Sequence, residues 1–564
     1  MNFWDIPASW WGQFALFWLC LALTVRPLGL YMAAVFAGER TFLSRLIEPV
    51  EKTFYRLCCI DPTHEMGWKE YTVNTLVFSF YCGASLFLIL LFQAYPVVDA
   101  DVAFNVATGY ITGTNWQATA PEVTLSALSQ MIGITTQNFL SAAVGLAVLM
   151  ALTRGLTRDR TTTIGNVWVD TVRATLYLLL PACILFALFL ISQGVVQTFG
   201  GLQLFSTLEP DSAQTILTGP IASVGAIKQL GTDGGGYYAA NAAHPLENPT
   251  PLSNFFQMLA MVLIPAASCI TYGKMTGNMK QGVAILAAMV LLFIPFSLYI
   301  AAVEQGGNPL LAPMGIDQSL GNMEGKELRW GTTGSSLWAT LTTATSGGTT
   351  NAALASFLPL SAAASLFLIH IGEIIFGGVG SGLYVMLAYV LLTVFIAGLM
   401  IGRTPSYLGK KIGVFEMQMI SIIIIIPVLF ALGTTALAVL LPDAHEATTS
   451  PHAQAFNDIL HAYSSASNNN GTGLGGLNTD TPFYNISLGI CILIGRFGVI
   501  AAVLALAGSM AGKGAIPDKK RSLNTTTPLF VFVLVFVILM SAMAFAPSIL
   551  IGFSHEHYHL AGGL

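Results

Sequence analysis

The sequence predicts an all-α polytopic membrane protein with ten transmembrane helices, and three observations support this. First, 54% of the 564 residues are hydrophobic and only 9% are charged, whereas soluble domains carry about 25% charged residues. Second, ten apolar runs are long enough to cross a bilayer, which takes about 20 residues. Third, four polar stretches rich in small residues lie between these runs at a nearly constant spacing. The net charge of −5 gives no support for a nucleic-acid partner.

The first apolar run is expected to be a retained helix, because the residues before it include no basic segment of the kind that opens a signal peptide. Trp4, Trp10 and Trp11 are typical of an aromatic belt at the membrane interface. The ten runs are residues 8–34, 70–95, 138–153, 168–195, 253–272, 281–303, 379–402, 414–441, 483–510 and 524–551.

The basic residues predict the orientation of these runs. Of the 23 Lys and Arg residues, 19 fall in five segments that each follow an odd-numbered run: 26–69, 154–173, 274–280, 403–411 and 513–521. Cytoplasmic loops carry an excess of Lys and Arg, so we expect these segments to be cytoplasmic and both termini to be extracytoplasmic. Lys228, Lys326 and Arg329 lie in the opposite loops, and Arg496 lies within a run.

The seven cysteines are expected to be structural. They are scattered, and most lie within apolar runs, where free Cys behaves as a small hydrophobic residue. The adjacent pair Cys58-Cys59 has no His or second Cys pair at the spacing of metal ligands.

Four polar stretches divide the chain into repeats. Each lies between two runs on the side opposite the basic segments, and each follows a short apolar segment. Thr114, Thr232, Ser346 and Asn468 stand at equivalent places, 118, 114 and 122 residues apart, and a fixed period is the signature of internal repeats. The stretches read Thr112-Gly113-Thr114-Asn115-Trp116-Gln117, Gly231-Thr232-Asp233-Gly234-Gly235, Ala344-Thr345-Ser346-Gly347-Gly348-Thr349 and Ser465-Ala466-Ser467-Asn468-Asn469-Asn470-Gly471.

This pattern predicts helix, re-entrant half-helix, extended segment and helix, repeated four times. Apolar stretches of 10–14 residues are more often re-entrant than spanning, and each half-helix would point the negative end of its dipole at the membrane centre. Irregular backbone persists at that depth only where it is buried in protein or lines a wet cavity. Four such ends, followed by carbonyls on glycine-rich backbone, are typical of a cation site.

Two other interpretations of the glycines are weaker. A phosphate-binding loop at residues 231–236 would need a following Gly-Lys-Ser/Thr, and the next lysine is Lys274. Residues 508–514 are one residue short of such a loop and lack its final Ser or Thr. A surface loop explains one such stretch but not four at a constant period.

Long motifs carry a resemblance to a known family; they lie at residues 26–29, 114–117, 137–142, 231–236, 244–250, 322–327, 372–384, 401–411, 468–471 and 495–500. With them the chain resembles, over essentially its whole length, the A subunit (KdpA) of the bacterial Kdp potassium-uptake ATPase. That family belongs to a superfamily of potassium transporters with four helix–pore–helix repeats, in agreement with the pattern above.

The resemblance implies a channel-like subunit of a high-affinity, ATP-driven K+ uptake pump in the bacterial inner membrane. Such a subunit binds K+ from outside in a four-repeat filter and passes it through an intramembrane tunnel to a P-type ATPase subunit (KdpB). A single-span C subunit (KdpC) and a small F peptide (KdpF) complete the implied complex in the lipid bilayer. This chain has no Asp-Lys-Thr-Gly-Thr phosphorylation motif, so we expect no ATP hydrolysis and no catalytic residue in it.

The repeats and the resemblance together predict the K+ filter residues: Thr112, Gly113, Thr114, Asn115, Gly231, Thr232, Asp233, Gly234, Gly235, Thr345, Ser346, Gly347, Gly348, Ser467, Asn468, Asn469, Asn470 and Gly471. Asp233 departs from the family pattern, which usually has Asn there. It is expected either to face the outer mouth and attract cations, or to point behind the filter and require a hydrogen-bond donor.

Gln117 and Arg496 are expected on the ion path below the filter. A charge within a span is costly and by default functional, and a fixed cation there would divert ions sideways; a structural salt bridge is the alternative for Arg496. Arg403, Lys410 and Lys411 are expected either to anchor the cytoplasmic boundary or to contact the ATPase subunit. Glu373 is expected either to face an internal aqueous path or to cap or pair within the helices.

We expect the first helix and its loop at residues 1–69, four repeats at 70–160, 161–275, 276–411 and 412–520, and the last helix with an outer tail at 521–564. The alternative function is a stand-alone K+ channel or ion-coupled K+ transporter of the same superfamily, whose members generally pair with a soluble nucleotide-binding regulator.

Overall fold

The computed structural model describes residues 6–206, 213–372, 374–514 and 523–560, so Glu373 lies outside the described residues. In the described part of the chain, ten helical runs are long and apolar enough to cross a membrane, which confirms the predicted fold class. They are α1 (Ala8–Ala37), α3 (Trp68–Leu91), a π-helical turn with α6 (Ser129–Thr157), α7 with α8 (Val167–Ser192), α10 (Pro251–Met275), α11 (Met279–Gln305), α14 (Ser381–Met400), α15 (Val414–Leu440), α18 with α19 (Pro482–Gly512) and α20 with α21 (Pro528–Tyr558).

Four shorter helices occupy the places expected for half-helices, one within each successive pair of spans: α4 (Ala100–Thr112), α9 (Ile221–Leu230), α12 (Gly331–Ala344) and α17 (His452–Ser467). At 1.5 Å per residue, these helices of 10 to 16 residues are about 15–24 Å long, too short to cross a hydrocarbon core of about 30 Å. The remaining elements are α2 (Ser44–Leu57), α5 (Pro121–Thr124), α13 (Pro359–His370), α16 (Pro442–Glu446), the paired strands β1 (Met66–Gly67) and β2 (Thr163–Gly165), the hairpin β3 (Gly201–Ser206) and β4 (Ala213–Thr218), and the pair β5 (Ser406–Tyr407) and β6 (Lys410–Lys411).

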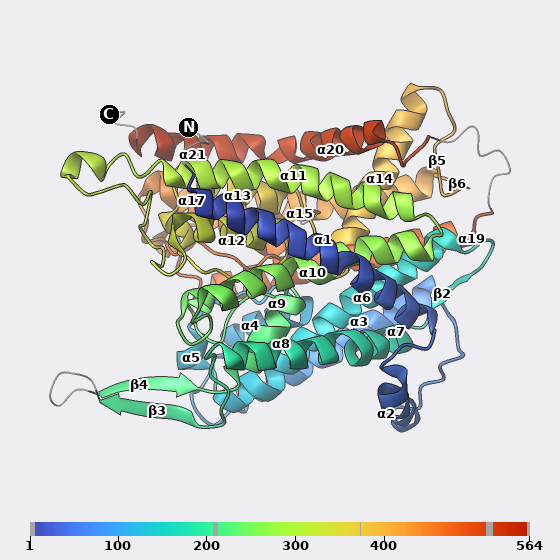
Figure 1. The fold of residues 1–564 in the computed structure, drawn as a ribbon, viewed down its shortest axis with the longest axis horizontal. Helices are drawn as coiled ribbons and strands as arrows, with labels where there is room; N and C mark the ends of the chain where they lie inside the picture. Colours follow the sequence, from blue (N-terminus) through green and yellow to red (C-terminus); the bar gives the residue numbers. More distant parts are fainter. Residues whose placement is uncertain (1–5, 207–212, 373, 515–522, 561–564) are drawn as a thin grey trace.

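The helices form one bundle with two chemically different ends. We call the end that carries α2, β2, β5 and β6 the basic end, because the described basic segments gather there; it is at the right in Figure 1. We call the opposite end, with α5, α17 and the hairpin β3–β4, the loop end. The helix α1 begins and α21 ends at the loop end (Figure 1).

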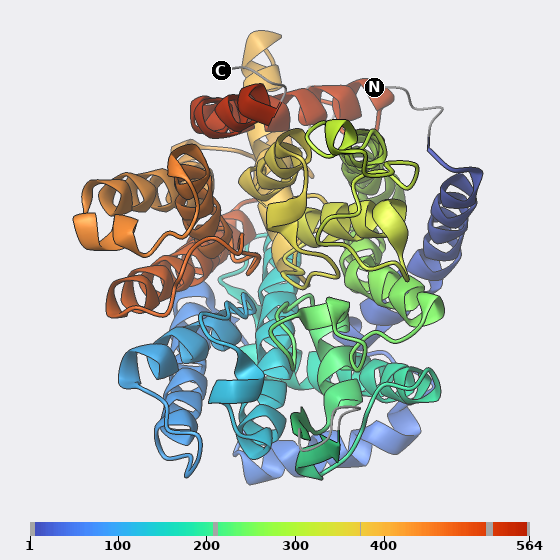
Figure 2. The same ribbon diagram turned by 90° about the vertical axis from the view of Figure 1, so that its left-hand side faces the viewer.

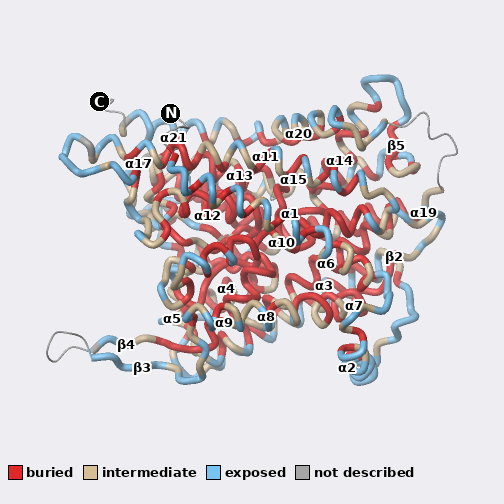
Figure 3. The backbone as a smooth tube through the Cα atoms, viewed as in Figure 1, coloured by how far each residue is buried: buried red, intermediate tan, exposed pale blue. Residues whose placement is uncertain are grey.

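The second helical run of each pair forms the inner layer of the bundle. In the most apolar 18-residue window of the runs containing α6, α10, α14 and α19, between 61% and 89% of the residues are buried, whereas the corresponding windows of α3, α8, α11 and α15 have between 22% and 44%. Figure 3 shows the buried residues concentrated along the middle of the bundle. The outer helices expose large apolar side chains such as Leu185 and Phe80, as expected of a surface whose solvent is lipid.

Small residues let these layers approach closely. A Cβ added to Gly29 of α1 would lie 2.6 Å from the Ala267 carbonyl oxygen of α10, and one added to Gly155 of α6 would lie 2.5 Å from the Ala507 carbonyl oxygen of α19. Both separations are too short for a side chain, so only glycine allows these helix pairs to pack at this distance. Helix interfaces in membranes depend on such small residues, because lipid supplies no hydrophobic force between helices.

A short helix and a buried non-helical segment precede the seventh run, and neither was predicted from the sequence. The helix α13 ends at His370, and α14 begins only at Ser381. The described residues between them, 371–372 and 374–380, are not helical and are almost entirely buried. Pro359 opens α13 as its first residue, and Gly377 and Gly380 have φ angles of 65° and 84°, so the backbone turns between α13 and α14 instead of joining them in one helix.

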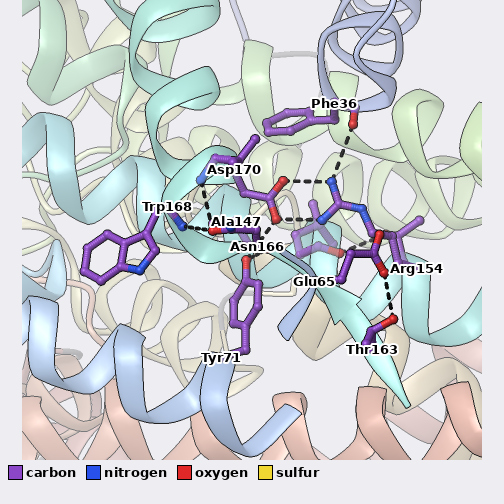
Figure 4. A network of polar contacts seen from close by, with 12 residues as sticks. Phe36, Glu65, Tyr71, Ala147, Arg154, Thr163, Asn166, Trp168 and Asp170 are labelled. Carbon is purple, nitrogen blue, oxygen red and sulfur yellow. Dashed lines mark hydrogen bonds and ion pairs between the residues drawn. The ribbon is translucent and has the colours of Figure 1, made fainter. Parts of the chain in front are cut away.

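A buried polar network joins α1, α3, α6 and α7 at the basic end (Figure 4). The Arg154 guanidinium donates to both carboxylate oxygens of Asp170, at 2.6 and 2.7 Å. The Tyr71 hydroxyl lies 2.9 Å from the Ala147 carbonyl oxygen and 3.1 Å from the Asp170 carboxylate. Because Asp170 is 1% exposed, this ion pair is compensated by hydrogen bonds rather than by water.

A second ion pair beside it is open to solvent. Arg158 donates to Glu65 at 2.6 and 2.7 Å, and the Thr163 hydroxyl donates to the same carboxylate at 2.7 Å. The hydrogen bond from Arg158, followed by that from Thr163, lowers the pKa of Glu65. Exposed pairs of this kind contribute about 0–1 kcal/mol to stability.

The two ion pairs give a matched prediction for stability. Asp170→Asn leaves a buried guanidinium without its counter-charge, and breaking a buried pair costs about 3–5 kcal/mol. Glu65→Gln removes only the exposed pair. In thermal unfolding of the purified protein in one detergent, we expect the midpoint of Asp170→Asn to fall several times further than that of Glu65→Gln. Equal midpoints for the two variants would contradict the structural role of Asp170.

Candidate functional site

The four short helices end near one another in the interior of the bundle. The residues that follow them are Gly113, Gly231, Thr345 and Asn468, and all four are buried. Figure 2 looks onto the loop end and shows the blue, green, yellow and orange quarters of the chain arranged around the centre. The last carbonyls of a helix lack partners within it, and its C-terminus carries the negative end of the helix dipole. The negative dipole ends of the four short helices therefore point toward the same place in the bundle.

The polar stretches at the C-terminal ends of these helices contact one another. We call them ring segments 1 to 4; they are residues 112–117, 231–236, 344–349 and 465–471. A Cβ added to Gly234 of segment 2 would lie 2.8 Å from the Gly347 carbonyl oxygen of segment 3. A Cβ on Gly348 would overlap the Asn470 carbonyl oxygen of segment 4. Gly234 and Gly348 also have φ angles of 85° and 56°, where a side chain is strained. Both positions therefore require glycine.

Two further contacts close the ring. A Cβ on Gly471 of segment 4 would overlap the Thr114 carbonyl oxygen of segment 1. The Asn115 side-chain amide of segment 1 donates to the Gly234 carbonyl of segment 2 at 3.0 Å. Contacts thus run from segment 1 through 2, 3 and 4 and back to 1, which brings together the residues predicted for the filter from all four repeats.

Side-chain amides support the ring from behind. The Asn469 amide donates to the Thr114 hydroxyl and to the Ile492 carbonyl, each at 3.0 Å. The Asn470 amide donates to the Thr342 and Thr345 carbonyls at 2.8 and 2.9 Å. These bonds hold non-helical backbone where lipid and water supply no partner.

Asp233 points behind the ring, which is the second of its two expected orientations. The Ser141 hydroxyl of α6 donates to its Oδ1 at 2.7 Å. The Oδ2 atom is buried and has no hydrogen-bond partner among the described residues. The carboxyl therefore has one donor from the inner helix layer, and Asp233 contributes its backbone rather than its side chain to the ring.

A cavity of about 340 Å³ lies on the loop side of the ring. Gly235, Gly348 and Gly471 line it together with Gln117, whose side-chain amide donates to the Gly236 carbonyl at 2.8 Å. Gln117 was expected below the ring with Arg496, and that expectation is wrong. The chain reverses at the end of α4 and runs back toward the loop end, so residues after Asn115 lie on the outer side.

A narrower cavity of about 50 Å³ lies on the other side of the ring, next to Ser467, Asn468 and Arg496. Arg496 is in the π-helical turn Ile494–Gly498 and is 7% exposed. In the described part of the chain, no carboxylate lies within ion-pair distance of its guanidinium. Arg496 therefore lines the cavity opposite the outer one and forms no salt bridge to a described residue.

The comparisons with known proteins decide the family. The model of the potassium-transporting ATPase A subunit (KdpA) matches residues 15–558. The chain belongs to this family. The potassium-transporting ATPase potassium-binding subunit of Sorangium cellulosum is 48% identical over 95% of this chain and 96% of its own length, and that of Herpetosiphon aurantiacus is 47% identical over 97% and 99%.

One solved structure shows the same fold at low identity. The crystal structure of the potassium transporter TrkH from Vibrio parahaemolyticus is 15% identical, with a TM-score of 0.50 over 85% of this chain and 97% of that one. The chain is thus a multi-pass membrane protein of the KdpA family, with the helical architecture of that transporter.

The interruption between α13 and α14 contacts the ring, and sequence reasoning missed it. The Val379 backbone N–H donates to the Thr232 hydroxyl at 2.8 Å. A Cβ added to Gly378 would lie 2.7 Å from the Ser346 hydroxyl oxygen. The glycines at 372, 377, 378, 380 and 382 lie within one of the motifs that carry the resemblance to KdpA. Glycines are potential helix breakers, so this cluster beside an apolar run is the signal in the sequence that could have located the segment.

The three basic residues that lie in the opposite loops form ion pairs or hydrogen bonds within the protein. Lys228 pairs with Glu247, which also accepts the Tyr238 N–H at 2.8 Å, and burial raises the pKa of Glu247 while the Lys228 ammonium opposes that rise. Lys326 pairs with Glu304 at 2.9 Å with both side chains fully buried. Arg329 donates to two backbone carbonyls at 2.6 and 2.8 Å. The excess of exposed Lys and Arg at the basic end over the loop end is therefore larger than the sequence alone indicated.

The residues considered for a partner contact divide into two groups. Arg403 and Lys411 are exposed. Lys410 is 2% exposed, and its ammonium donates to the Gly155 and Met510 carbonyls at 2.9 and 2.7 Å and to the Arg158 carbonyl. Lys410 therefore joins β6 to α6 and α19 and, unlike Arg403 and Lys411, is held inside the chain.

A pair of neighbouring substitutions tests this assignment. Lys410→Met leaves three buried carbonyls without a charged donor, and each such bond is worth about 1.5–3 kcal/mol. We expect a clear fall in the thermal midpoint for Lys410→Met and none for Lys411→Met. If Lys410→Met kept its midpoint but lost co-purifying subunits, Lys410 would be a partner contact after all.

Proposed function

We propose that this chain is the channel-like subunit of a high-affinity, ATP-driven K+ uptake pump, and that the ring binds K+. The observation that carries the proposal is the closed ring, in which four helix C-termini and four glycine-containing backbone segments meet in a buried place. Membership in the family supports the role as a pump subunit, since the relatives are named potassium-binding subunits of a potassium-transporting ATPase.

The ring offers the chemistry that a potassium ion requires. Backbone carbonyls can replace the oxygen ligands of its hydration shell, and the convergent dipoles favour a cation over an anion. Discrimination by such a site depends on the number and placement of the carbonyls. The glycines and the amides of Asn115, Asn469 and Asn470 hold those carbonyls in place, so selectivity rests on backbone geometry rather than on a carboxylate.

The proposed path runs from the outer cavity through the ring to the inner cavity. There the Arg496 guanidinium repels an ion from the direct route to the cytoplasm, and the segment 374–380 covers the ring from below. The ion leaves sideways through an intramembrane tunnel to a P-type ATPase subunit (KdpB), which hydrolyses ATP. A C subunit (KdpC) and an F peptide (KdpF) complete the complex, and the exposed Arg403 and Lys411 are available for contact with a subunit.

The proposed setting is the bacterial inner membrane, with the basic end in the cytoplasm and both termini outside. The excess of exposed Lys and Arg at that end supports this orientation, because Lys228, Lys326 and Arg329 are all engaged within the protein. The six segments expected from the sequence, with boundaries at residues 69, 160, 275, 411 and 520, remain our proposed division into four repeats and two flanking helices.

Purification without cross-linker tests the pump against a stand-alone channel or ion-coupled transporter. We expect the chain to co-elute with a P-type ATPase subunit whose ATP hydrolysis is stimulated by K+. The chain reconstituted alone should not conduct K+. Passive K+ flux through the isolated chain, without co-eluting ATPase, would overturn the proposal.

Gly234→Ala tests the ring as the K+ site. The new Cβ would meet the Gly347 carbonyl oxygen at 2.8 Å and would sit on backbone with φ of 85°, so we expect the apparent K+ affinity to fall at least about tenfold, the equivalent of 1.4 kcal/mol. The control is Gly475→Ala, which lines the outer cavity but whose Cβ would meet nothing within 4 Å. The readout is K+-stimulated ATP hydrolysis of the complex; equal affinities for both variants would place K+ elsewhere.

Asp233→Asn tests whether this side chain contributes charge or only shape. Asn has the same shape and keeps an oxygen to accept the Ser141 hydrogen bond, so we expect an apparent K+ affinity within about threefold of the wild type at pH 7. Asp233→Leu lacks the acceptor and leaves the Ser141 hydroxyl with only the Asn138 carbonyl, at 3.2 Å, so the apparent K+ affinity should fall at least about tenfold. A large loss in Asp233→Asn would show that the carboxylate charge itself supports K+ binding.

A further inference from the structure

A large cavity at the basic end is not used by the proposed ion path. Its volume is about 980 Å³, and it lies between α2, α3, α6 and α7, within the size range of sites for organic ligands. Its walls include Phe54, Phe78 and Trp168. Figure 4 shows the Trp168 side chain turned away from the Arg154–Asp170 pair, so the polar network and this cavity lie on different sides of α7.

The cavity reaches from the end of the bundle into the depth of the spans. The hydrogen bond between Tyr71 and Ala147 marks a common level of α3 and α6. Phe78 is seven residues beyond Tyr71, and Leu140 is seven residues before Ala147, so both lie about 10 Å further from the basic end. With Val172 and Leu176 they make an apolar inner part of the cavity.

The mouth of the cavity is polar and acidic. Asp61, His64 and Glu70 line it and are exposed, and His64 lies 2.8 Å from Glu70. Hydrogen bonds from Thr63 lower the pKa of Asp61, so it is a carboxylate at neutral pH. The described residues that line this cavity include no Lys or Arg.

One buried polar group within the cavity lacks a partner. The Thr171 residue is 6% exposed, and its hydroxyl has no hydrogen-bond partner among the described residues. An unsatisfied buried hydroxyl costs about 1–3 kcal/mol. Thr171 lines the cavity, but its hydroxyl oxygen is shielded, so it can donate to an internal acceptor of a ligand only after the side chain rotates about χ1.

The helix α2 places the mouth at the level of lipid headgroups. Leu46, Val50, Phe54 and Leu57 form an exposed apolar stripe along it, while Glu51 fixes its opposite face to Arg173 at 3.1 Å. An amphipathic helix of this kind lies in the membrane interface with its apolar face in the acyl region. In Figure 1 it crosses the ends of the neighbouring spans rather than running parallel to them.

We infer that this cavity binds one glycerophospholipid with an amine headgroup, such as phosphatidylethanolamine, from the leaflet at the basic end. An acyl chain occupies the apolar part between Phe78, Leu140 and Leu176. An ester carbonyl accepts a hydrogen bond from Thr171. The ammonium of the headgroup lies at Asp61 and Glu70, and the absence of lining cations disfavours an anionic headgroup at this mouth. This site is independent of K+ binding in the ring.

Quenching of tryptophan fluorescence by brominated lipid tests the inference. The full chain with its co-purifying subunits is delipidated in detergent and titrated with phosphatidylethanolamine brominated on one acyl chain. The difference between the wild type and Trp168→Phe isolates the emission of Trp168. We expect it to fall by at least half and to saturate at one lipid per chain, with unbrominated phosphatidylethanolamine competing and phosphatidylglycerol competing at least fivefold less well.

Two variants and a control locate the site. Val172→Phe fills the cavity and should abolish the Trp168-specific quenching. Thr171→Val removes only the hydroxyl and should weaken lipid binding about fivefold. Leu185→Phe, on the exposed face of α8, should change nothing. Native mass spectrometry should find one retained phospholipid in the control and none in Val172→Phe.

Three results would overturn the inference. One is the absence of saturable quenching of Trp168. Another is unchanged quenching in Thr171→Val, which keeps the test decisive if Val172→Phe fails to fold. The third is quenching of the isolated chain but not of the complex, which would show that a subunit rather than a lipid occupies the cavity.

Discussion

The structure depends on the need of non-helical backbone to find hydrogen-bond partners where lipid offers none. The four ring segments and the interruption between α13 and α14 place such backbone in the middle of the bundle. The inner helices support the ring with polar side chains such as Ser141 of α6, which donates to the Asp233 carboxylate behind the ring. Asn470 satisfies two carbonyls of the third repeat, and Asn469 satisfies the Ile492 carbonyl in its own repeat. A ring of this kind therefore requires an inner helix layer that is buried and partly polar, inside an outer layer that is apolar.

The same constraint explains the ion pairs at the loop end. Glu247 holds the backbone N–H of Tyr238, just beyond ring segment 2, and pairs with Lys228 of the half-helix that precedes this segment. It therefore connects the two sides of one ring segment. Glu304 similarly accepts from Lys326, from the Asn322 amide and from the Leu358 N–H, at 2.8–2.9 Å. These carboxylates are structural supports for segments that cannot form helices.

Much of the fold and of the candidate site was predictable because both follow from local pattern. The apolar runs are set by the thickness of the bilayer, and the period of the four polar stretches marked the repeats. The orientation of Asp233 was not predictable, because a carboxylate beside a glycine segment can face either side of it. The burial of Lys410 was not predictable for a related reason. A lysine next to another lysine is usually exposed, and only the packing of α6 and α19 provides the three carbonyls that accept its hydrogen bonds.

The sequence by itself determined the number of spans, the place of the four half-helices and the family, since each depends on composition, length and motif along the chain. The tertiary structure decided on which side of the ring each residue lies. Gln117 lies on the outer side because the chain reverses at the end of α4, and Arg496 lies on the inner side because α18 returns past the ring. It also decided that a non-helical segment lies beneath the ring, just before α14, since the Val379 N–H bonds to Thr232, which is 147 residues earlier. Contacts between residues so far apart exist only after the repeats have packed against one another.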